Sequence, residues 1–163
     1  MQVDTARLVL RPLSRPEAEA VVRGERAGQP WSPGFPRDDD MDAARMLLAA
    51  AAAPGGRDLG YGSYLLVLRA SVLVVGSAGF FGPPDEDGTV MIGYGLVPEA
   101  RGQGLATEAV GGLVGLVRDD PRVRRVLAET DSGNAASRRV LEKAGFRRVD
   151  GDPDRHGFEL TLG

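Results

Sequence analysis

Apolar and polar residues along this chain repeat with two different periods. Residues 3–11 alternate with the period of a strand that has one buried face, and Leu8 and Leu10 fall on the same side. Segments of this kind, rich in β-branched and aromatic residues, predict strands at 3–11, 61–68, 72–81, 89–97, 123–129, 146–149 and 157–162. Apolar residues at helical spacing predict helices at 14–26, 41–53, 105–118 and 132–144.

The order of these segments predicts the fold class. Strands and helices interleave, which is typical of an α/β domain with a mixed central sheet of about seven strands and about four flanking helices. An apolar helix separates the strands at 89–97 and 123–129, so we expect these two strands to run parallel. Residues 1–163 contain no repeat and no stretch that resembles a linker, and we expect a single domain.

Residues at the helix ends support these boundaries. Ser14 and Glu17 have the spacing of a capping box at the start of the first helix. Asp131 or Ser132 is the expected N-cap of the last helix, and Gly145 is its expected stop. The aspartates at 38–40 precede the second helix, where negative charge complements the helix dipole. The alternative interpretation of these aspartates is an acidic rim that attracts a cationic molecule.

The composition and net charge of the chain argue against several kinds of partner and site. A net charge of -3 argues against nucleic acid or an anionic membrane as a partner. The chain has no cysteine, which excludes disulfides, thiolate metal sites and a cysteine acyl-enzyme. Its first residues do not build an apolar signal segment, and no run reaches the roughly 18 apolar residues of a membrane span. We therefore expect a cytoplasmic protein that binds neither nucleic acid nor membrane.

Residues 92–107, with the sequence IGYGLVPEARGQGLAT, combine a strand, a glycine-bearing turn and a helix start. Such a turn gathers backbone N–H groups at the positive end of a helix dipole, which makes an anion site. Gly102 and Gly104 allow positive φ and a close approach of the backbone to a phosphate. A dinucleotide fingerprint would need glycine at Thr107, and a Walker loop would need a G-K-[ST] sequence that this stretch lacks.

A third pattern, [Q/R]-x-x-G-x-[G/A], is met by Arg101, Gly104 and Ala106. It resembles the loop that binds the coenzyme-A pyrophosphate in the GNAT superfamily of N-acetyltransferases. Residues 134–146 (NAASRRVLEKAGF) are similar to the final GNAT motif, N-x-x-S-x-x-x-x-E-K-x-G-F, of the ribosomal-protein N-terminal acetyltransferase branch. Residues 7–13 (RLVLRPL) resemble the first strand of that branch. The three resemblances together span nearly the whole chain, although each motif alone also fits an ordinary turn or helix start.

The resemblance implies a GNAT fold whose sheet splays apart at the coenzyme-A site, with acetyl-coenzyme A as cosubstrate and no metal. Leu96 and Val97 would pair with the pantetheine arm, and the Leu96 amide would polarise the thioester carbonyl. Asn134 would bond the pantetheine, and Ser137 would lie near the sulfur. The pyrophosphate would be held by Arg101, Gly102, Gln103, Gly104, Leu105, Ala106 and Thr107.

Acetyl transfer to an amine makes two demands on proton chemistry. The amine, with a pKa of about 10.4 for a lysine-like group, must lose a proton, and the departing thiolate can accept one from an acid. Many GNAT enzymes have a tyrosine acid four residues before the glycine of the last motif, where this chain has Leu141. We therefore expect Ser137 to be the acid, directly or through water. Glu129 is the expected base because burial at a strand end would raise its pKa, with Tyr94, His156 and Glu159 as further candidates.

The motifs do not specify the amine. The branch favours a protein N-terminal amine, whereas many relatives of this pattern act on small amines. We expect the variable segment 24–60, which contains Trp31 and Phe35, to form the acceptor pocket. A homodimer is the commonest assembly of soluble oligomers and is a candidate here. The missing tyrosine leaves open an alternative of another class, a non-catalytic acyl-CoA-binding sensor or regulatory module.

Overall fold

The computed structural model describes all residues except 1, 27, 29, 53–60 and 150–153. Within the described residues, eight strands form one sheet in the order β1-β2-β3-β4-β5-β6-β8-β7. The strands are β1 (Val3–Asp4), β2 (Leu8–Pro12), β3 (Ser63–Leu68), β4 (Val74–Phe80), β5 (Thr89–Leu96), β6 (Arg125–Asp131), β7 (Arg147–Val149) and β8 (Arg155–Thr161). The helices are α1 (Arg15–Arg23), α2 (Asp38–Ala52), α3 (Leu105–Val117) and α4 (Ala135–Lys143), with a 3-10 turn, η2, at Pro98–Ala100.

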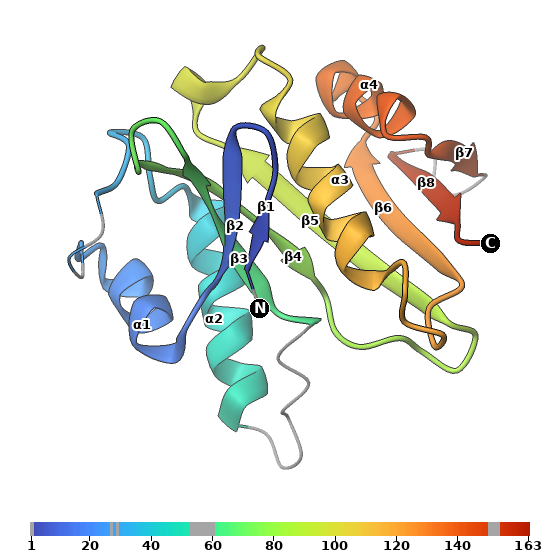
Figure 1. Cartoon of the computed structure of the whole chain (residues 1–163), viewed down its shortest axis with the longest axis horizontal. Helices are drawn as coiled ribbons and strands as arrows, with labels where there is room; N and C mark the ends of the chain where they lie inside the picture. Colours follow the sequence, from blue (N-terminus) through green and yellow to red (C-terminus); the bar gives the residue numbers. More distant parts are fainter. Residues whose placement is uncertain (1, 27, 29, 53–60, 150–153) are drawn as a thin grey trace.

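The predicted α/β class and mixed sheet are confirmed. β5 and β6 pair in parallel across α3, and the other neighbouring strands pair antiparallel. Helices α3 and α4 lie on one face of the sheet, and α1 and α2 lie on the other (Figure 1). None of the helices in the described part of the chain is long and apolar enough to cross a membrane.

Several predicted boundaries are wrong. The second helix begins at Asp38, so the aspartates at 38–40 form its first turn and do not precede it. The single strand expected at 3–11 is a hairpin, because Thr5 N–H donates to the Leu8 carbonyl at 2.8 Å and closes a turn between β1 and β2. The first helix ends at Arg23 because Gly24 adopts φ 71° and caps it. The last helix is capped by Asn134, whose side chain accepts the Ser137 N–H, and not by Asp131 or Ser132. The turn expected at 150–153 lies outside the described residues.

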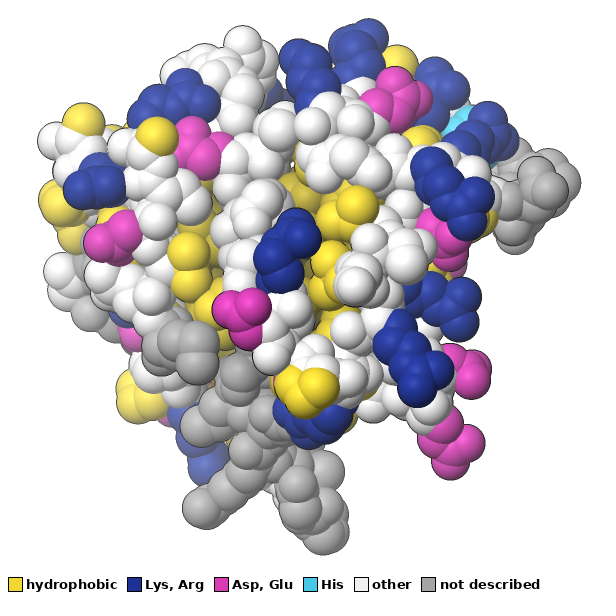
Figure 2. Space-filling model, turned by 45° about the vertical axis from the view of Figure 1, so that its right-hand side comes forward, with side chains coloured by type: hydrophobic (Ala, Val, Ile, Leu, Met, Phe, Trp, Pro, Cys, Tyr) yellow, Lys and Arg dark blue, Asp and Glu magenta, His cyan; other side chains and the backbone are white. Residues whose placement is uncertain are grey.

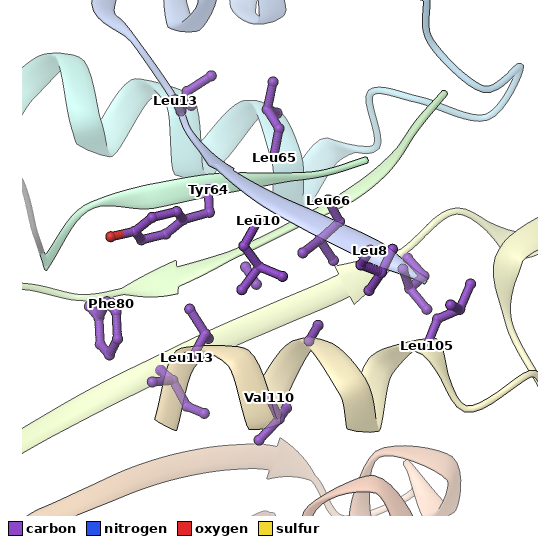
Figure 3. Close-up of a cluster of buried hydrophobic side chains, with 14 of the residues drawn as sticks. Leu8, Leu10, Leu13, Tyr64, Leu65, Leu66, Phe80, Leu105, Val110 and Leu113 are labelled. Atoms are coloured by element: carbon purple, nitrogen blue, oxygen red, sulfur yellow. The ribbon is translucent and has the colours of Figure 1, made fainter. Parts of the chain in front are cut away.

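The core on the α3 face sets how closely that helix approaches the sheet. Leu8 and Leu10 of β2 and Val110 and Leu113 of α3 are fully buried. In Figure 3, Leu8, Leu10 and Leu113 lie on the side of α3 toward β2, and Val110 lies on its other side, toward β6. A Cβ placed on Gly112 would lie 2.9 Å from Leu10 Cδ2, so the middle of α3 packs closely against β2 at this glycine.

The predicted splay of the sheet lies between β5 and β6. Their parallel pairing ends at Ile92 and Ala128. Beyond that point, residues 93–96 pair only with β4, and residues 129–131 pair only with β8. The facing edges of β5 and β6 are therefore open, next to the first turn of α3 and the start of α4.

Candidate active site

A cavity of about 520 Å³ lies where β5 and β6 separate, and we call it the loop-side cavity. Of the residues expected to bind the cosubstrate, those that line it are Leu96, Arg101, Gly102, Gly104, Leu105, Ala106, Thr107, Asn134 and Ser137. Val97 and Gln103 do not line it. The structure thus brings two motifs that are separated in the sequence by residues 108–133 to the same cavity.

The turn before α3 has the geometry expected of an anion site. Gly102 adopts φ 78° and Gly104 adopts φ 82°, in the left-handed region that favours glycine. The first-turn amides of α3, at 105–107, have no acceptor within the helix because helix geometry provides none. Four cationic side chains also line the cavity, namely Arg37, Arg101, Arg139 and Lys143, together with the single carboxylate of Asp39. The cavity therefore favours an anion, and specifically one with several negative oxygens.

Leu96 and Val97 have different roles. The Val97 N–H donates to the Val75 carbonyl at 2.8 Å, the Val97 carbonyl accepts from Ala100, and the side chain is fully buried. Because successive residues of a strand point to opposite edges, the Leu96 N–H points to the open edge of β5. Arg101 Nε donates to the Leu96 carbonyl at 3.0 Å, so the loop folds back onto this strand end. Leu96 is thus the residue that presents a backbone donor to the cavity.

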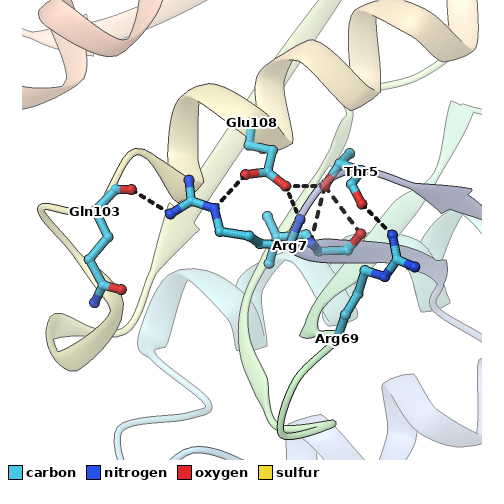
Figure 4. Close-up of polar contacts among 6 residues, drawn as sticks. Thr5, Arg7, Arg69, Gln103 and Glu108 are labelled. Carbon is cyan, nitrogen blue, oxygen red and sulfur yellow. Dashed lines mark hydrogen bonds and ion pairs between the residues drawn. The ribbon is translucent and has the colours of Figure 1, made fainter.

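Arg7 fixes the loop from outside the cavity (Figure 4). Its Nη1 donates to the Gln103 carbonyl at 2.8 Å, and its Nε donates to Glu108 Oε2 at 2.9 Å. Glu108, in the first turn of α3, also accepts from the Thr5 hydroxyl and the Arg7 N–H. Burial alone would raise the pKa of Glu108, but these hydrogen bonds and the Arg7 charge lower it below its ordinary value. The turn between β1 and β2 is therefore tied to the loop and the helix start.

Tyr94 and Ser137 form a pair that sequence reasoning did not identify. Tyr94 Oη and Ser137 Oγ lie 2.6 Å apart, and Tyr94 Oη also lies 3.3 Å from the Ser137 carbonyl. Burial raises the pKa of Tyr94 above its ordinary value, although the hydrogen bond with Ser137 partly offsets the rise. Tyr94 therefore holds its proton at neutral pH. Leu141, at the position where many GNAT enzymes have tyrosine, is fully buried and does not reach the cavity lining.

Glu129 lies on the opposite edge of the splay. Together with Tyr94, Ser137 and Asn134, it lines a cavity of about 390 Å³, the β6-side cavity. The expected burial of Glu129 is wrong, because its side chain is 46% exposed and pairs with Arg155 at 3.1 Å. Asn134 uses its Oδ1 to cap α4, which leaves Nδ2 as the donor for a ligand.

Arg37 is a second residue that sequence reasoning missed. Its guanidinium pairs with the buried Asp40 at 2.7 Å, and Asp40 also accepts from Ser77 Oγ at 2.5 Å. A Cβ placed on Gly95 would lie 2.4 Å from Arg37 Nη1, so the guanidinium lies directly over the bare backbone of β5. The unusual glycines of 92–96 and the polar run at 37–40 are the sequence features that could have indicated this contact.

A third cavity, the α2-side cavity, has a volume of about 450 Å³ and opens on the other side of Tyr94. Arg37, Asp39 and Tyr94 line both this cavity and the loop-side cavity, so the two meet at these residues. Trp31 and Phe35, expected in the acceptor pocket, are instead buried against each other with ring centroids 5.3 Å apart. The segment 24–60 supplies Arg37, Asp39, Asp42, Ala43 and Met46 to the lining in their place, and its last part lies outside the described residues.

Basic side chains gather on the surface over α4 and the C-terminal strands, around the histidine drawn in cyan (Figure 2). That histidine, His156, lines none of the three cavities. Burial and the charges of Arg148 and Arg138 lower the pKa of His156, which favours the neutral ring. Glu159 pairs with Arg147 and is likewise absent from the cavity linings.

Comparisons with known proteins agree with this architecture. Residues 7–147 match the acetyltransferase (GNAT) domain. The uncharacterized N-acetyltransferase YjdG of Bacillus subtilis (strain 168) is 27% identical over 149 residues, which cover 88% of each chain. A GNAT-family acetyltransferase from Bacillus anthracis superposes with a TM-score of 0.69 at 20% identity, covering 99% of both chains. RimL, a ribosomal L7/L12 α-N-protein acetyltransferase solved with coenzyme A, superposes with a TM-score of 0.73 at 15% identity, covering 99% of this chain and 98% of RimL.

Proposed function

Because the chain belongs to the GNAT family of acetyltransferases, we propose that it transfers the acetyl group of acetyl-coenzyme A to a primary amine. The amine attacks the thioester directly while both substrates are bound. The observation that supports this most strongly is the position of Tyr94, which is the one residue shared by the linings of the three described cavities. Two substrates that enter from opposite sides of the splay would therefore meet beside its hydroxyl.

The loop-side cavity takes acetyl-coenzyme A in this proposal. Its pyrophosphate binds the amides of 102–107, with Arg101, Arg139 and Lys143 supplying positive charge. The pantetheine arm extends along the open edge of β5, and Asn134 Nδ2 donates to it from α4, which leaves the Leu96 N–H for the thioester carbonyl. Val97 has no part in this binding, because its amide and carbonyl are both bonded within the chain.

The chemistry then follows from the groups around Tyr94. The neutral amine adds to the thioester carbonyl, and the Leu96 N–H stabilises the negative oxygen that develops there. As the carbon–sulfur bond breaks, the thiolate takes a proton from the Tyr94–Ser137 pair. Ser137 is thus the acid expected from the sequence, acting together with Tyr94, and the pair replaces the tyrosine that α4 lacks.

The proton lost by the amine leaves through the β6-side cavity. Glu129 lines that cavity with Tyr94 and Ser137, and its exposed carboxylate accepts the proton through water. Because its carboxylate is 46% exposed and lies 3.1 Å from Arg155, Glu129 acts as a relay toward solvent.

The test is the release of free thiol from acetyl-coenzyme A in the presence of amines, alongside calorimetric measurement of coenzyme-A binding. We expect thiol release that depends on the amine, and equal amounts of acetylated amine and thiol. Tight binding of coenzyme A without thiol release on any amine, from peptide N-termini to small monoamines and polyamines, would contradict the proposal and favour the acyl-CoA sensor. Glu129→Gln should lower kcat most at low pH, where fewer amine molecules are neutral.

A further inference from the structure

We infer that the acceptor is a monoamine with an apolar group beside its nitrogen, and that Met46 and Phe81 bind that group. This inference rests on the proposed acetyl transfer and specifies the class of amine. It concerns the α2-side cavity, which meets the cosubstrate cavity at Arg37, Asp39 and Tyr94. An amine bound there has its nitrogen toward Tyr94 and its carbon skeleton toward α2 and the end of β4.

The apolar side of the cavity is unusually exposed. The large hydrophobic side chains exposed among the described residues are Met46 at 40%, Val72 at 56% and Phe81 at 58%. Met46 and Phe81 both line the α2-side cavity, whereas Val72 lies in the turn between β3 and β4. Exposed apolar side chains that line the same cavity are typical of a binding site, whereas singly exposed apolar residues are scattered over the surface of most proteins.

Gly93 allows Phe81 to take this position. A Cβ placed on Gly93 would lie 3.1 Å from both Cε2 and Cζ of Phe81. The ring therefore lies over the bare backbone of β5, one residue before Tyr94. A ligand group that stacks on Phe81 would thus lie beside the residue that joins the cavities.

The charged residues of the cavity limit how many cationic groups of an acceptor can be bound. Its carboxylates, Asp39, Asp42 and Asp131, give the mouth an acidic character that attracts an ammonium group. Each of them, however, already lies near an arginine: Asp39 at 3.9 Å from Arg37, Asp42 at 3.0 Å from Arg45, and Asp131 at 3.2 Å from Arg155. Because Asp42 and Asp131 are paired closely with arginines, the cavity offers one ammonium site, at the loosely paired and 86% exposed Asp39, and not the several independent sites that a polyamine needs.

Thiol release with a matched panel of amines tests the inference. The panel contains phenylalaninamide, leucinamide and glycinamide, which share an α-amine, together with 2-phenylethylamine and spermidine. We expect kcat/KM for phenylalaninamide and leucinamide to exceed that for glycinamide by about tenfold or more, and spermidine to be the poorest substrate. A preference for phenylalaninamide over 2-phenylethylamine identifies a peptide-like acceptor. The reverse preference identifies a small amine without a carboxamide.

Two variants and a control assign the effect to the cavity. Phe81→Ala should reduce the preference for phenylalaninamide over glycinamide by about tenfold, and Met46→Glu should raise spermidine turnover while lowering that of leucinamide. Val72→Ala removes exposed apolar surface elsewhere and should leave every ratio unchanged. Equal rates on glycinamide and phenylalaninamide, or ratios that Phe81→Ala does not alter, would overturn the inference while acetyl transfer stands. Absence of thiol release with every amine would overturn the proposed transfer itself.

Discussion

The hydroxyl of Tyr94 on β5 lies 2.6 Å from the hydroxyl of Ser137 on α4, across the point where the sheet opens. The two residues are 43 positions apart in the sequence. Their contact places a partly buried phenol, with a raised pKa, between the cavities for the two proposed substrates. In the proposed mechanism, the strand and the helix together supply the proton donor for the thiolate, while the helix has Leu141 at the position where many GNAT enzymes have tyrosine.

Tyr94→Phe should lower kcat by about 10- to 100-fold and leave the Kd for coenzyme A nearly unchanged, because it removes a proton donor and little binding surface. Ser137→Ala should have a smaller effect, since Tyr94 retains the Ser137 carbonyl as a partner at 3.3 Å. Steady-state kinetics and calorimetry measure the two quantities separately. If both variants keep full kcat, the pair has no role as the acid.

Gly104→Asp should weaken coenzyme-A binding by at least about tenfold, because φ 82° strains any side chain and the carboxylate repels the pyrophosphate. Gly104→Ala introduces the strain without the charge and should weaken binding less. Gly111→Ala is the matched control, since an added Cβ there has nothing within 4 Å, and it should stabilise α3 by about 0.5–1 kcal/mol. Unchanged coenzyme-A affinity in Gly104→Asp would contradict the assignment of the loop.

Arg7→Met should raise the Kd for coenzyme A several-fold, because it frees the Gln103 carbonyl and the loop that follows β5. Binding of a pantetheine fragment without the pyrophosphate should change little, since the fragment does not reach the loop. Arg15→Met, which removes an exposed pair with Glu19, serves as the control. Equal losses for the fragment and for coenzyme A would indicate a general structural defect and exclude a role specific to the loop.

The stability contributed by Glu108 should depend on pH in a defined direction. Its lowered pKa means that the folded state favours the charged form, so this contribution is present above the ordinary pKa of 4.5 and is lost as pH falls through the lowered value. Urea unfolding of the wild type and of Glu108→Gln should therefore differ clearly at pH 7 and converge in acid. A difference in stability that stays constant from pH 7 to pH 3 would show that the carboxylate charge is not responsible.

Asp40→Asn should destabilise the fold by about 3 kcal/mol, because the side chain of Asp40 is 1% exposed and its loss leaves the Arg37 guanidinium uncompensated. Arg37 would also shift from its place over Gly95, so kcat/KM should fall for every amine. Asp38→Asn, exposed in the first turn of α2 and outside the three cavity linings, should change stability by less than about 1 kcal/mol and kcat/KM by less than about twofold. Chemical denaturation and the amine assay together separate the structural effect from the catalytic one.

Much of the fold could be predicted because it depends on local patterns. The periods of apolar residues identified the strands and helices, and the helix between 89–97 and 123–129 predicted the parallel pair. Hydrogen bonds between distant segments decided what these patterns could not. The predicted first strand is divided into β1 and β2 where Arg7 pairs with Glu108 of α3. The last helix begins after Asn134 because the Asn134 side chain accepts the Ser137 N–H.

For the site, the sequence by itself determined the anion loop, since glycine spacing and a helix start are local properties of the backbone. It also identified Asn134 and Ser137 through a second motif. Only the tertiary structure decided that Tyr94 meets Ser137, that Arg37 lies over Gly95, and that Met46 and Phe81 share a cavity while Trp31 and Phe35 are buried. The physical reason is that these side-chain contacts depend on strand register and on how helices pack against the sheet. A shift of one residue in register would turn each of these strand side chains to the other face of the sheet.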